Sequence, residues 1–229
     1  MTQVSRRHLL AGAAGAAAVY GAATAHAATT SDLNICAAPK FDESFDLVVI
    51  GSGGAGLSSA VMAKQQGVKR ILVLEKMAFL GGNTAISGGG FNSYDPPRQQ
   101  AQGIKDSPEL HFENTYDGGD RRANPELVHA MTENSYAAIQ WLESIGMKFK
   151  PNVYQIYGGL YPRCHAPYGS LGSDYIKVLK AQCDKLGIEI RTNSRVVRVL
   201  RESPLEGKVT GVEYVDKSGK KHVIEATLS

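Results

Sequence analysis

Residues 45–76 read FDLVVIGSGGAGLSSAVMAKQQGVKRILVLEK. This stretch carries the strongest fold signal in the chain. It begins with a short, apolar, β-branched run, Phe45–Ile50, which predicts a buried parallel strand. A helix is expected over Leu57–Gln66 and a second strand over Ile71–Leu74, which ends at Glu75. Strand, helix and strand in this order predict a βαβ unit and therefore an α/β fold.

Three glycines between the first strand and the helix indicate what the unit binds. Gly51, Gly53 and Gly56 form the pattern G-x-G-x-x-G. The first permits a tight turn, the second lets the backbone approach a pyrophosphate, and the third lets helix and strand pack closely. The N–H groups of the helix start, helped by the helix dipole, can then hold the diphosphate. Glu75 lies 19 residues after Gly56, the spacing expected for an acid that accepts ribose hydroxyls, and it argues against NADP.

The next segment, Lys76–Asn92, favours FAD over NAD. It contains five glycines, with Asn83, Thr84 and Ser87 among them, where a simple NAD domain would continue into another helix. Small side chains and exposed backbone suit close approach to a flat ring and a ribityl-phosphate chain. A flexible surface loop is the alternative interpretation.

Further stretches give the chain a family resemblance. The motifs GSGGAG and LEK are followed by GGNTAISGGGFN (81–92), DSPELHFENTYDGGDRRANPELV (106–128) and WLESIGMKF (141–149). Together they resemble the flavoprotein of the fumarate reductase and succinate dehydrogenase superfamily. They are most similar to the periplasmic flavocytochrome c type fumarate reductases and their urocanate- and methacrylate-reducing relatives. The resemblance covers about residues 43–229.

The resemblance implies a non-covalently bound FAD and a set of residues that hold it. These are Gly51, Gly53, Ala55 and Gly56 at the pyrophosphate, Glu75 and then Lys76 at the ribose, Asn83, Thr84, Gly88, Gly89 and Gly90 along the diphosphate and isoalloxazine, and Val196 at the adenine. It also implies hydride transfer from flavin N5 to the β-carbon of an α,β-unsaturated carboxylate.

We expect an α/β Rossmann-like FAD/NAD(P)-binding fold of three layers, with a parallel sheet and a β-meander. The predicted meander strands are Arg195–Arg201, Lys208–Tyr214 and His222–Glu225. We expect the chain to divide into a twin-arginine signal peptide (1–27), a linker (28–42) and the FAD-binding domain that the resemblance covers (43–229). We expect this domain to be incomplete at its C-terminal end, because the family's capping domain and last FAD-contacting segment have no counterpart in the sequence.

The middle of the chain predicts two helices from their start signals. Ser107 and Asn124 are each followed by Pro-Glu, which predicts helices over 108–117 and 127–145. The expected buried stripe of the second helix comprises Leu127, Met131, Ile139 and Leu142.

The tyrosine-rich segment Pro151–Gly172 supplies the candidate residues for the substrate side. The family's matching loop carries an A-H-R-P-like segment beside the flavin, and here it reads Cys164-His165-Ala166-Pro167. Arg163 and His165 are therefore candidates, and a packed loop with a structural histidine is the alternative.

No catalytic residue can be nominated, because the family's proton-donating and carboxylate-binding residues are expected beyond this sequence. We therefore expect the chain alone to be inactive. Two alternatives to a fumarate-type reductase stay open. One is a flavoenzyme of the 3-ketosteroid dehydrogenase type, and the other is a non-catalytic flavin-binding remnant.

The start of the chain indicates where the protein works. Residues 5–10, SRRHLL, have the twin-arginine form, and Ala25-His26-Ala27 is a small-x-small cleavage site. The Ala/Gly stretch between them is too short to serve comfortably as a membrane span. The sequence therefore predicts twin-arginine export to the periplasm, with no stable membrane insertion after cleavage.

Charge and cysteines limit the partners. The formal charge is +3, and removal of residues 1–27 takes away two arginines and no acids, which leaves +1 and no electrostatic case for nucleic acid. The three cysteines have no metal-ligand spacing and no C-x-x-C-H pattern, so we expect no metal site and no haem on this chain. If the protein is a reductase, a separate cytochrome c is the expected electron donor.

Overall fold

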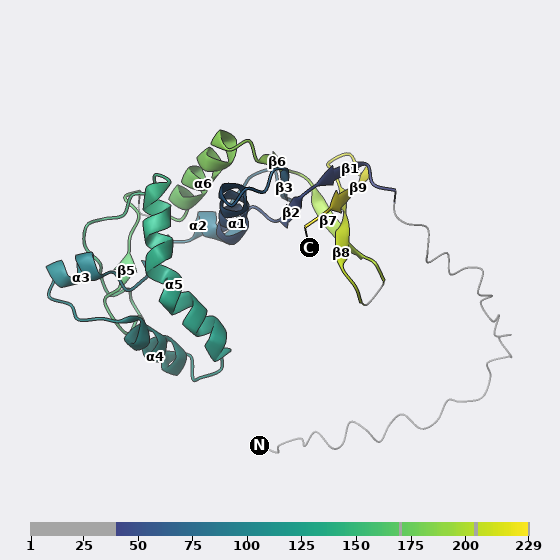
Figure 1. The fold of residues 1–229 in the computed structure, drawn as a ribbon. Coiled ribbons are helices and arrows are strands. Elements are labelled where there is room, and N and C mark those ends of the chain that lie inside the picture. The colour runs from purple at the N-terminus through teal and green to yellow at the C-terminus, as the bar shows by residue number, and fades with distance from the viewer. Residues whose placement is uncertain (1–39, 170, 204–205, 229) are drawn as a thin grey trace, which may run out of the picture. The chain divides into compact units, whose positions relative to one another are not determined.

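A computed structural model of the chain describes residues 40–169, 171–203 and 206–228. The predicted leader and residues 28–39 of the predicted linker lie outside these ranges. The helices are α1 (Gly54–Gln65), α2 (Gly82–Ile86), α3 (Pro96–Ala101), α4 (Pro108–Gly118), α5 (Pro125–Ser144) and α6 (Ser173–Lys185). The strands are β1 (Glu43–Phe45), β2 (Leu47–Ile50), β3 (Ile71–Leu74), β4 (Phe91–Asn92), β5 (Cys164–His165), β6 (Glu189–Arg191), β7 (Arg195–Arg201), β8 (Val209–Val215) and β9 (Lys221–Ala226) (Figure 1).

Two sheets and a group of helices confirm the predicted three-layer α/β fold. Strands β2, β3 and β6 form a parallel sheet in the order β2-β3-β6. Strands β7, β8 and β9 form the predicted antiparallel meander, and β1 joins its far edge parallel to β9. The central strand β3 is buried along its whole length, because it is covered on both faces.

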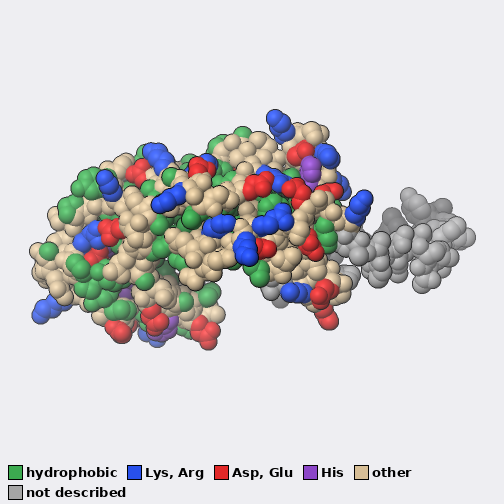
Figure 2. Space-filling model, turned by 45° about the horizontal axis from the view of Figure 1, so that its top comes forward, with side chains coloured by type: hydrophobic (Ala, Val, Ile, Leu, Met, Phe, Trp, Pro, Cys, Tyr) green, Lys and Arg blue, Asp and Glu red, His purple; other side chains and the backbone are tan. Residues whose placement is uncertain are grey.

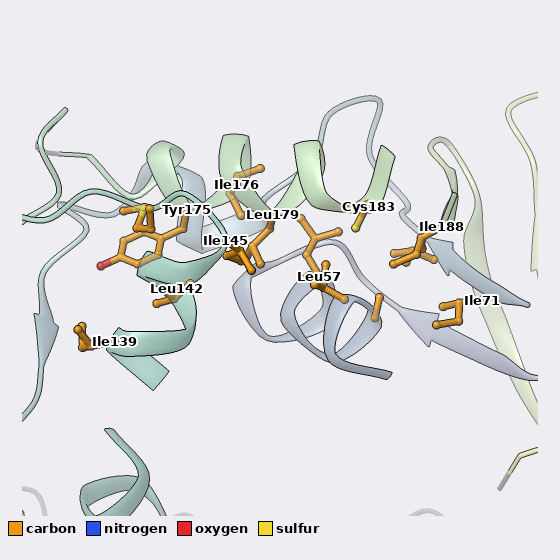
Figure 3. Close-up of a cluster of buried hydrophobic side chains, with 14 of the residues drawn as sticks. Leu57, Ile71, Ile139, Leu142, Ile145, Tyr175, Ile176, Leu179, Cys183 and Ile188 are labelled. Carbon is orange, nitrogen blue, oxygen red and sulfur yellow. The ribbon is translucent and has the colours of Figure 1, made fainter. Parts of the chain in front are cut away.

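The side chains of β3 alternate between two hydrophobic clusters, which defines the layers. Ile71 and Val73 belong to a cluster formed with α1, α5 and α6, whereas Leu72 and Leu74 pack with β8 and β9. Figure 3 shows Leu179 of α6 near Leu57 of α1 in the first cluster. The parallel sheet is therefore the middle layer, with helices on one face and the meander on the other.

The predicted strand Phe45–Ile50 is wrong in one respect, since it is two strands in two different sheets. Phe45 ends β1 and pairs with Ala226 of β9, whereas Leu47 starts β2 and pairs with Ile71 of β3. The chain bends at Asp46, whose carboxylate accepts hydrogen bonds from the backbone N–H groups of Lys69 and Arg70 at 3.1 and 2.8 Å. The sequence pattern does not reveal this change of sheet, because the residues that fix the bend, Lys69 and Arg70, lie more than 20 positions further along the chain.

The helix starts agree with the sequence signals, but the buried stripe of α5 is partly wrong. Ile139 and Leu142 are buried as predicted, whereas Leu127 and Met131 are 69% and 48% exposed. The buried positions toward the start of α5 are Val128, Thr132 and Ser135. The stripe therefore runs one residue away from the predicted one and includes two hydroxyl side chains, which a search for apolar spacing misses.

The two segments predicted as irregular contain short regular elements. α2 lies inside Lys76–Asn92, and β4 at its end pairs antiparallel with β5 of the tyrosine-rich segment, where Phe91 faces His165. In the part of the chain that the structure describes, no helix has the length and apolar character needed to cross a membrane.

Candidate cofactor-binding site

The site begins at the turn between β2 and α1. Gly51 has a φ of 98°, which side-chain-bearing residues rarely adopt, and its N–H donates to Leu74 O at 2.8 Å. A Cβ on Gly56 would lie 2.1 Å from the carbonyl oxygen of Gly51, so only glycine allows α1 to approach the strand this closely. The geometry agrees with the roles predicted for the first and third glycines.

The N-terminus of α1 has no cap of its own. Gly53 is the N-cap residue, it provides no side-chain hydrogen bond, and the first turn of the helix contains no acidic residue. A Cβ on Gly53 would be in ordinary van der Waals contact with its nearest neighbour, Gly81 O, at 3.8 Å, so close packing within the protein does not require glycine here. The N–H of Gly54 donates to Thr84 Oγ1, and the other N–H groups of the first turn, with the positive end of the dipole, are suited to an anion such as a pyrophosphate.

Glu75 lies at the end of β3 beside this turn and is 6% exposed. Its Oε2 accepts hydrogen bonds from Ser52 N at 2.9 Å and Ser52 Oγ at 2.6 Å, and its Oε1 accepts from Met77 N at 2.8 Å. Burial would raise the pKa of this carboxyl, but the bonds from Ser52 and Met77 outweigh it and hold the pKa below its usual value. Glu75 is therefore an ionised acceptor, and it has lone pairs left for a ribose hydroxyl.

Two hydroxyl groups join the glycine turn to the segment that follows β3. Thr84 Oγ1 accepts from Gly54 N at 3.0 Å, and Ser52 Oγ accepts from Gly81 N at 3.2 Å. Ser52 is completely buried and links Glu75 to Gly81. Sequence reasoning missed Ser52, although its place between two glycines of the motif could have marked it.

The glycines of the predicted flavin loop lie against the start of α6. Gly89 has a φ of 73°, and a Cβ there would lie 2.7 Å from the backbone of Leu171. A Cβ on Gly90 would lie 2.7 Å from Cys164 Sγ, whereas Gly88 is exposed with no neighbour within 4 Å. The loop is therefore packed on one side and open on the other, which is not the flexible surface loop of the alternative interpretation.

The remaining predicted cofactor residues lie around this turn and loop. Ala55, Lys76 and Asn83 are exposed. Val196 is half-buried in β7, and the segment just before it is joined to the end of β3, because Ser194 N donates to Glu75 O at 2.8 Å. The structure thus brings the predicted pyrophosphate, ribose and adenine residues to one edge of the parallel sheet.

Arg163 belongs to a buried ion pair on the other side of the loop. Its Nη2 and Nε donate to the two carboxylate oxygens of Asp106 at 2.6 and 3.0 Å, and its Nη1 donates to Asn114 Oδ1 at 3.1 Å. Burial would raise the pKa of Asp106, but the hydrogen bonds from Arg163, Gln99 and Ser107 and the charge of Arg163 together hold it below its usual value. The guanidinium is 4% exposed, and its charge is matched inside the protein.

His165 is fully buried and has polar neighbours at both ring nitrogens. Its Nε2 lies 2.9 Å from Asp95 Oδ2, and its Nδ1 lies 3.1 Å from the carbonyl oxygens of Phe91 and Arg163. Asp95 also accepts from Arg98 Nη1 at 2.6 Å. In this geometry His165 holds β5 against β4 and α3, and its use at the substrate side stays a prediction.

His111 of α4 was not singled out in the sequence, and it is chemically unusual. It is 3% exposed, and its Nδ1 has no hydrogen-bond partner among the described residues. Burial, with the charge of Arg163 as a smaller cause, lowers its pKa from 6.5 to about 4. In the described ranges, no three His, Cys, Asp or Glu side chains form a cluster that could hold a metal ion.

Comparison with known proteins assigns this arrangement to a family. A sequence family described as "FAD binding domain" matches residues 46–228. The chain belongs to this FAD binding domain family. The open α1 N-terminus, the ionised Glu75 and the bare face of Gly88 fit the diphosphate, ribose and ring of such a cofactor.

Three known proteins are similar to this chain over most of its length. A fumarate reductase (cytochrome) of Shewanella frigidimarina is 36% identical over 172 residues, which are 74% of this chain and 29% of that protein. The open conformation of a flavocytochrome c3 fumarate reductase matches with a TM-score of 0.75 at 31% identity, over 81% of this chain and 33% of that one. A 3-ketosteroid-Δ4-(5α)-dehydrogenase of Rhodococcus jostii RHA1, bound to 4-androstene-3,17-dione, matches with a TM-score of 0.72 at 25% identity, over 82% of this chain and 45% of that one.

These matches confirm the predicted resemblance to fumarate reductase flavoproteins. The FAD binding domain spans less than half the length of each of the three relatives.

Proposed function

We propose that this chain holds the FAD of an oxidoreductase that reduces an α,β-unsaturated carboxylate of the fumarate type. The observation that carries the proposal is the convergence of the Gly51–Gly56 turn, Glu75 and the segment 81–84 at one edge of the sheet, from which the chain leads into the Gly88–Gly90 loop. When bound, FAD would supply the hydride at flavin N5 for this reduction. The 36% identity to a fumarate reductase favours this substrate class.

The chain's own contribution is binding and orientation. The uncapped N–H groups at the start of α1 would hold the diphosphate, and Glu75 would accept from the ribose. Ala55, Lys76, Asn83 and Val196 are proposed to complete the dinucleotide contacts, which are non-covalent. The exposed residues Gly88 and Gly90 of the loop would lie along the isoalloxazine.

Arg163 and His165 are proposed to act on the substrate side as positioning residues. Both side chains are saturated by internal partners, so a direct role would require these bonds to break. Their proposed effect is to hold the strand pair β4–β5, which continues directly from Gly90.

The proposed setting is the periplasm, reached by twin-arginine export, with electrons delivered by a separate cytochrome c. Residues 5–10 and the lack of C-x-x-C-H in the sequence support this. On the face seen in Figure 2, lysine and arginine side chains are interspersed with acidic ones, which favours a small substrate over nucleic acid.

A second candidate is a 3-ketosteroid-type flavoenzyme, which the match to the Rhodococcus jostii structure supports. To separate the candidates, the purified protein is incubated with FAD, freed of excess cofactor and scanned for flavin absorbance. It is then assayed with reduced methyl viologen and fumarate, urocanate or methacrylate, and with 4-androstene-3,17-dione and an electron acceptor.

Bound flavin with turnover of an unsaturated carboxylate supports the proposal, whereas turnover of the steroid alone favours the second candidate. Bound flavin without turnover of any of these supports FAD binding and agrees with the expected inactivity of the chain alone. A colourless protein contradicts FAD binding by this chain.

A further inference from the structure

The start of α6 and the Gly88–Gly90 loop are interlocked, although they are more than 80 residues apart in the sequence. Gly172, just before α6, donates from its N–H to Ser87 O at 2.9 Å. A Cβ on Gly172 would lie 1.9 Å from Thr84 O, and a Cβ on Gly89 would lie 2.8 Å from Gly172 N. Both glycines are therefore needed for the same close approach between two backbones.

Tyr175, in the first turn of α6, makes a polar contact between the helix and the loop. Its hydroxyl donates to Gly89 O at 2.8 Å, and the contact is buried. The ring is fixed from behind by Phe149, whose centroid lies 6.0 Å away. Burial raises the pKa of the Tyr175 hydroxyl, so it keeps its proton and stays a donor at any pH the protein meets.

The hydrogen bond from Tyr175 to Gly89 O fixes the direction in which the Gly89 carbonyl points. With its carbonyl turned toward Tyr175, Gly89 keeps its left-handed conformation, and neighbouring Gly88 stays exposed with open space around it. Without the hydroxyl, a buried carbonyl would lack its partner, and a peptide that has no side chain on either residue could rotate to find another.

We propose that Tyr175 is a positioning residue for the cofactor loop, which it holds in the one backbone conformation that can lie along the isoalloxazine. This inference rests on the proposed binding of FAD, but the loop conformation itself can be tested without the cofactor.

The test uses Tyr175→Phe, which removes only the hydroxyl and keeps the ring against Phe149. Tyr161→Phe is the matched control, because the Tyr161 hydroxyl also donates to a backbone carbonyl, that of Lys105, away from the loop. Hydrogen exchange is measured on the cofactor-free full chain, for peptides covering 82–91 and, as an internal reference, 71–75. FAD affinity is then measured by quenching of flavin fluorescence.

We expect Tyr175→Phe to speed exchange in 82–91 about tenfold and to weaken FAD binding about tenfold, with 71–75 unchanged. Tyr161→Phe should change neither quantity.

Unchanged exchange in 82–91 overturns the proposal, as does faster exchange in both peptides, which would indicate general destabilisation. If the wild-type chain binds no FAD but its loop responds, the proposed function fails while the loop-holding role stands. If it binds FAD and Tyr175→Phe binds it equally well, the role toward the cofactor is wrong.

Discussion

Two regions of the molecule differ in how their polar groups are bonded. One is the cofactor edge (Gly51–Gly56, Glu75 and 81–90), and the other is the block formed by α3, α4, α5 and β5. In the block, the N-termini of α3, α4 and α5 are capped by the side chains of Asp95, Ser107 and Asn124. At the cofactor edge, α1 starts with glycine and has neither a side-chain cap nor an acid in its first turn.

The buried charges follow the same division. Asp106 and Asp95 are matched by Arg163, Arg98 and His165 within the block. Glu75 is ionised with only neutral donors around it, and its carboxylate still has acceptor capacity. The block is therefore a closed scaffold, in which the buried polar groups bond to one another. The cofactor edge instead leaves hydrogen-bonding capacity for a ligand. Its polar groups are held in place but are not all used.

The largest effect is expected from Gly56→Ala. The added methyl would overlap the Gly51 carbonyl oxygen at 2.1 Å, and this oxygen belongs to the backbone, so it cannot move aside as a flexible side chain would. We expect the free energy of unfolding to fall by more than about 3 kcal/mol, measured by urea denaturation.

Gly53→Ala is the matched control, since its methyl would make an ordinary van der Waals contact, 3.8 Å from the nearest atom, Gly81 O. It should fold normally but bind FAD more weakly, because the space is reserved for the ligand. Equal stability losses in the two variants would contradict the division between packing and binding glycines.

A somewhat smaller loss is expected when the closed block is broken at Arg163→Met. The substitution keeps much of the volume but leaves the Asp106 carboxylate buried without its cation. Removing one partner of a buried pair costs roughly 3 kcal/mol, read from the thermal or urea midpoint. Arg121→Met, which breaks the exposed pair with Asp117, should produce no measurable change. A stable Arg163→Met variant would show that the pair does not hold the block.

His111 should make the block sensitive to acid. Its pKa is lowered from 6.5 to about 4 in the folded protein, so the unfolded state binds the proton more readily between these values. The free energy of unfolding therefore has its full value above about pH 6.5, and it falls by about 3 kcal/mol as the pH drops toward 4.

His111→Gln should remove most of this slope in urea titrations at several pH values. His129→Gln, at the half-exposed histidine of α5, should leave it in place. The same slope in wild type and His111→Gln would assign the pH dependence to other groups.

The smallest effects come from exchanging the two kinds of helix start. Ser107→Ala removes the cap bond to Leu110 N and should cost about 1 kcal/mol. Gly53→Ser offers α1 a cap, because its φ of −68° and ψ of 177° suit a serine N-cap. We expect a gain of a few tenths of a kcal/mol in the cofactor-free protein together with weaker FAD binding. Tighter FAD binding by Gly53→Ser would contradict the idea that the open N-terminus is kept for the ligand.

Much of the fold could be predicted, because its signals lie close together in the sequence. The glycine pattern, the Pro-Glu helix starts and the meander strands were confirmed within a few residues. The predictions failed where a choice depends on a distant partner. The bend at Asp46 is bonded to backbone donors at Lys69 and Arg70, and Ser135 on the buried face of α5 accepts from Ser93, which lies 42 residues earlier in the chain.

By itself, the sequence determined the class of the domain and of its cofactor, because a strand, a glycine turn, a helix and a terminal acid act over a short range. The tertiary structure determined which polar side chains are bonded inside the protein and which can still bond to a ligand. It placed Ser52 between Glu75 and Gly81, enclosed Arg163 and His165 in internal pairs, and put Tyr175 behind Gly89. The physical reason is that hydrogen-bond satisfaction and close packing depend on contacts between segments that the chain brings together only when it folds.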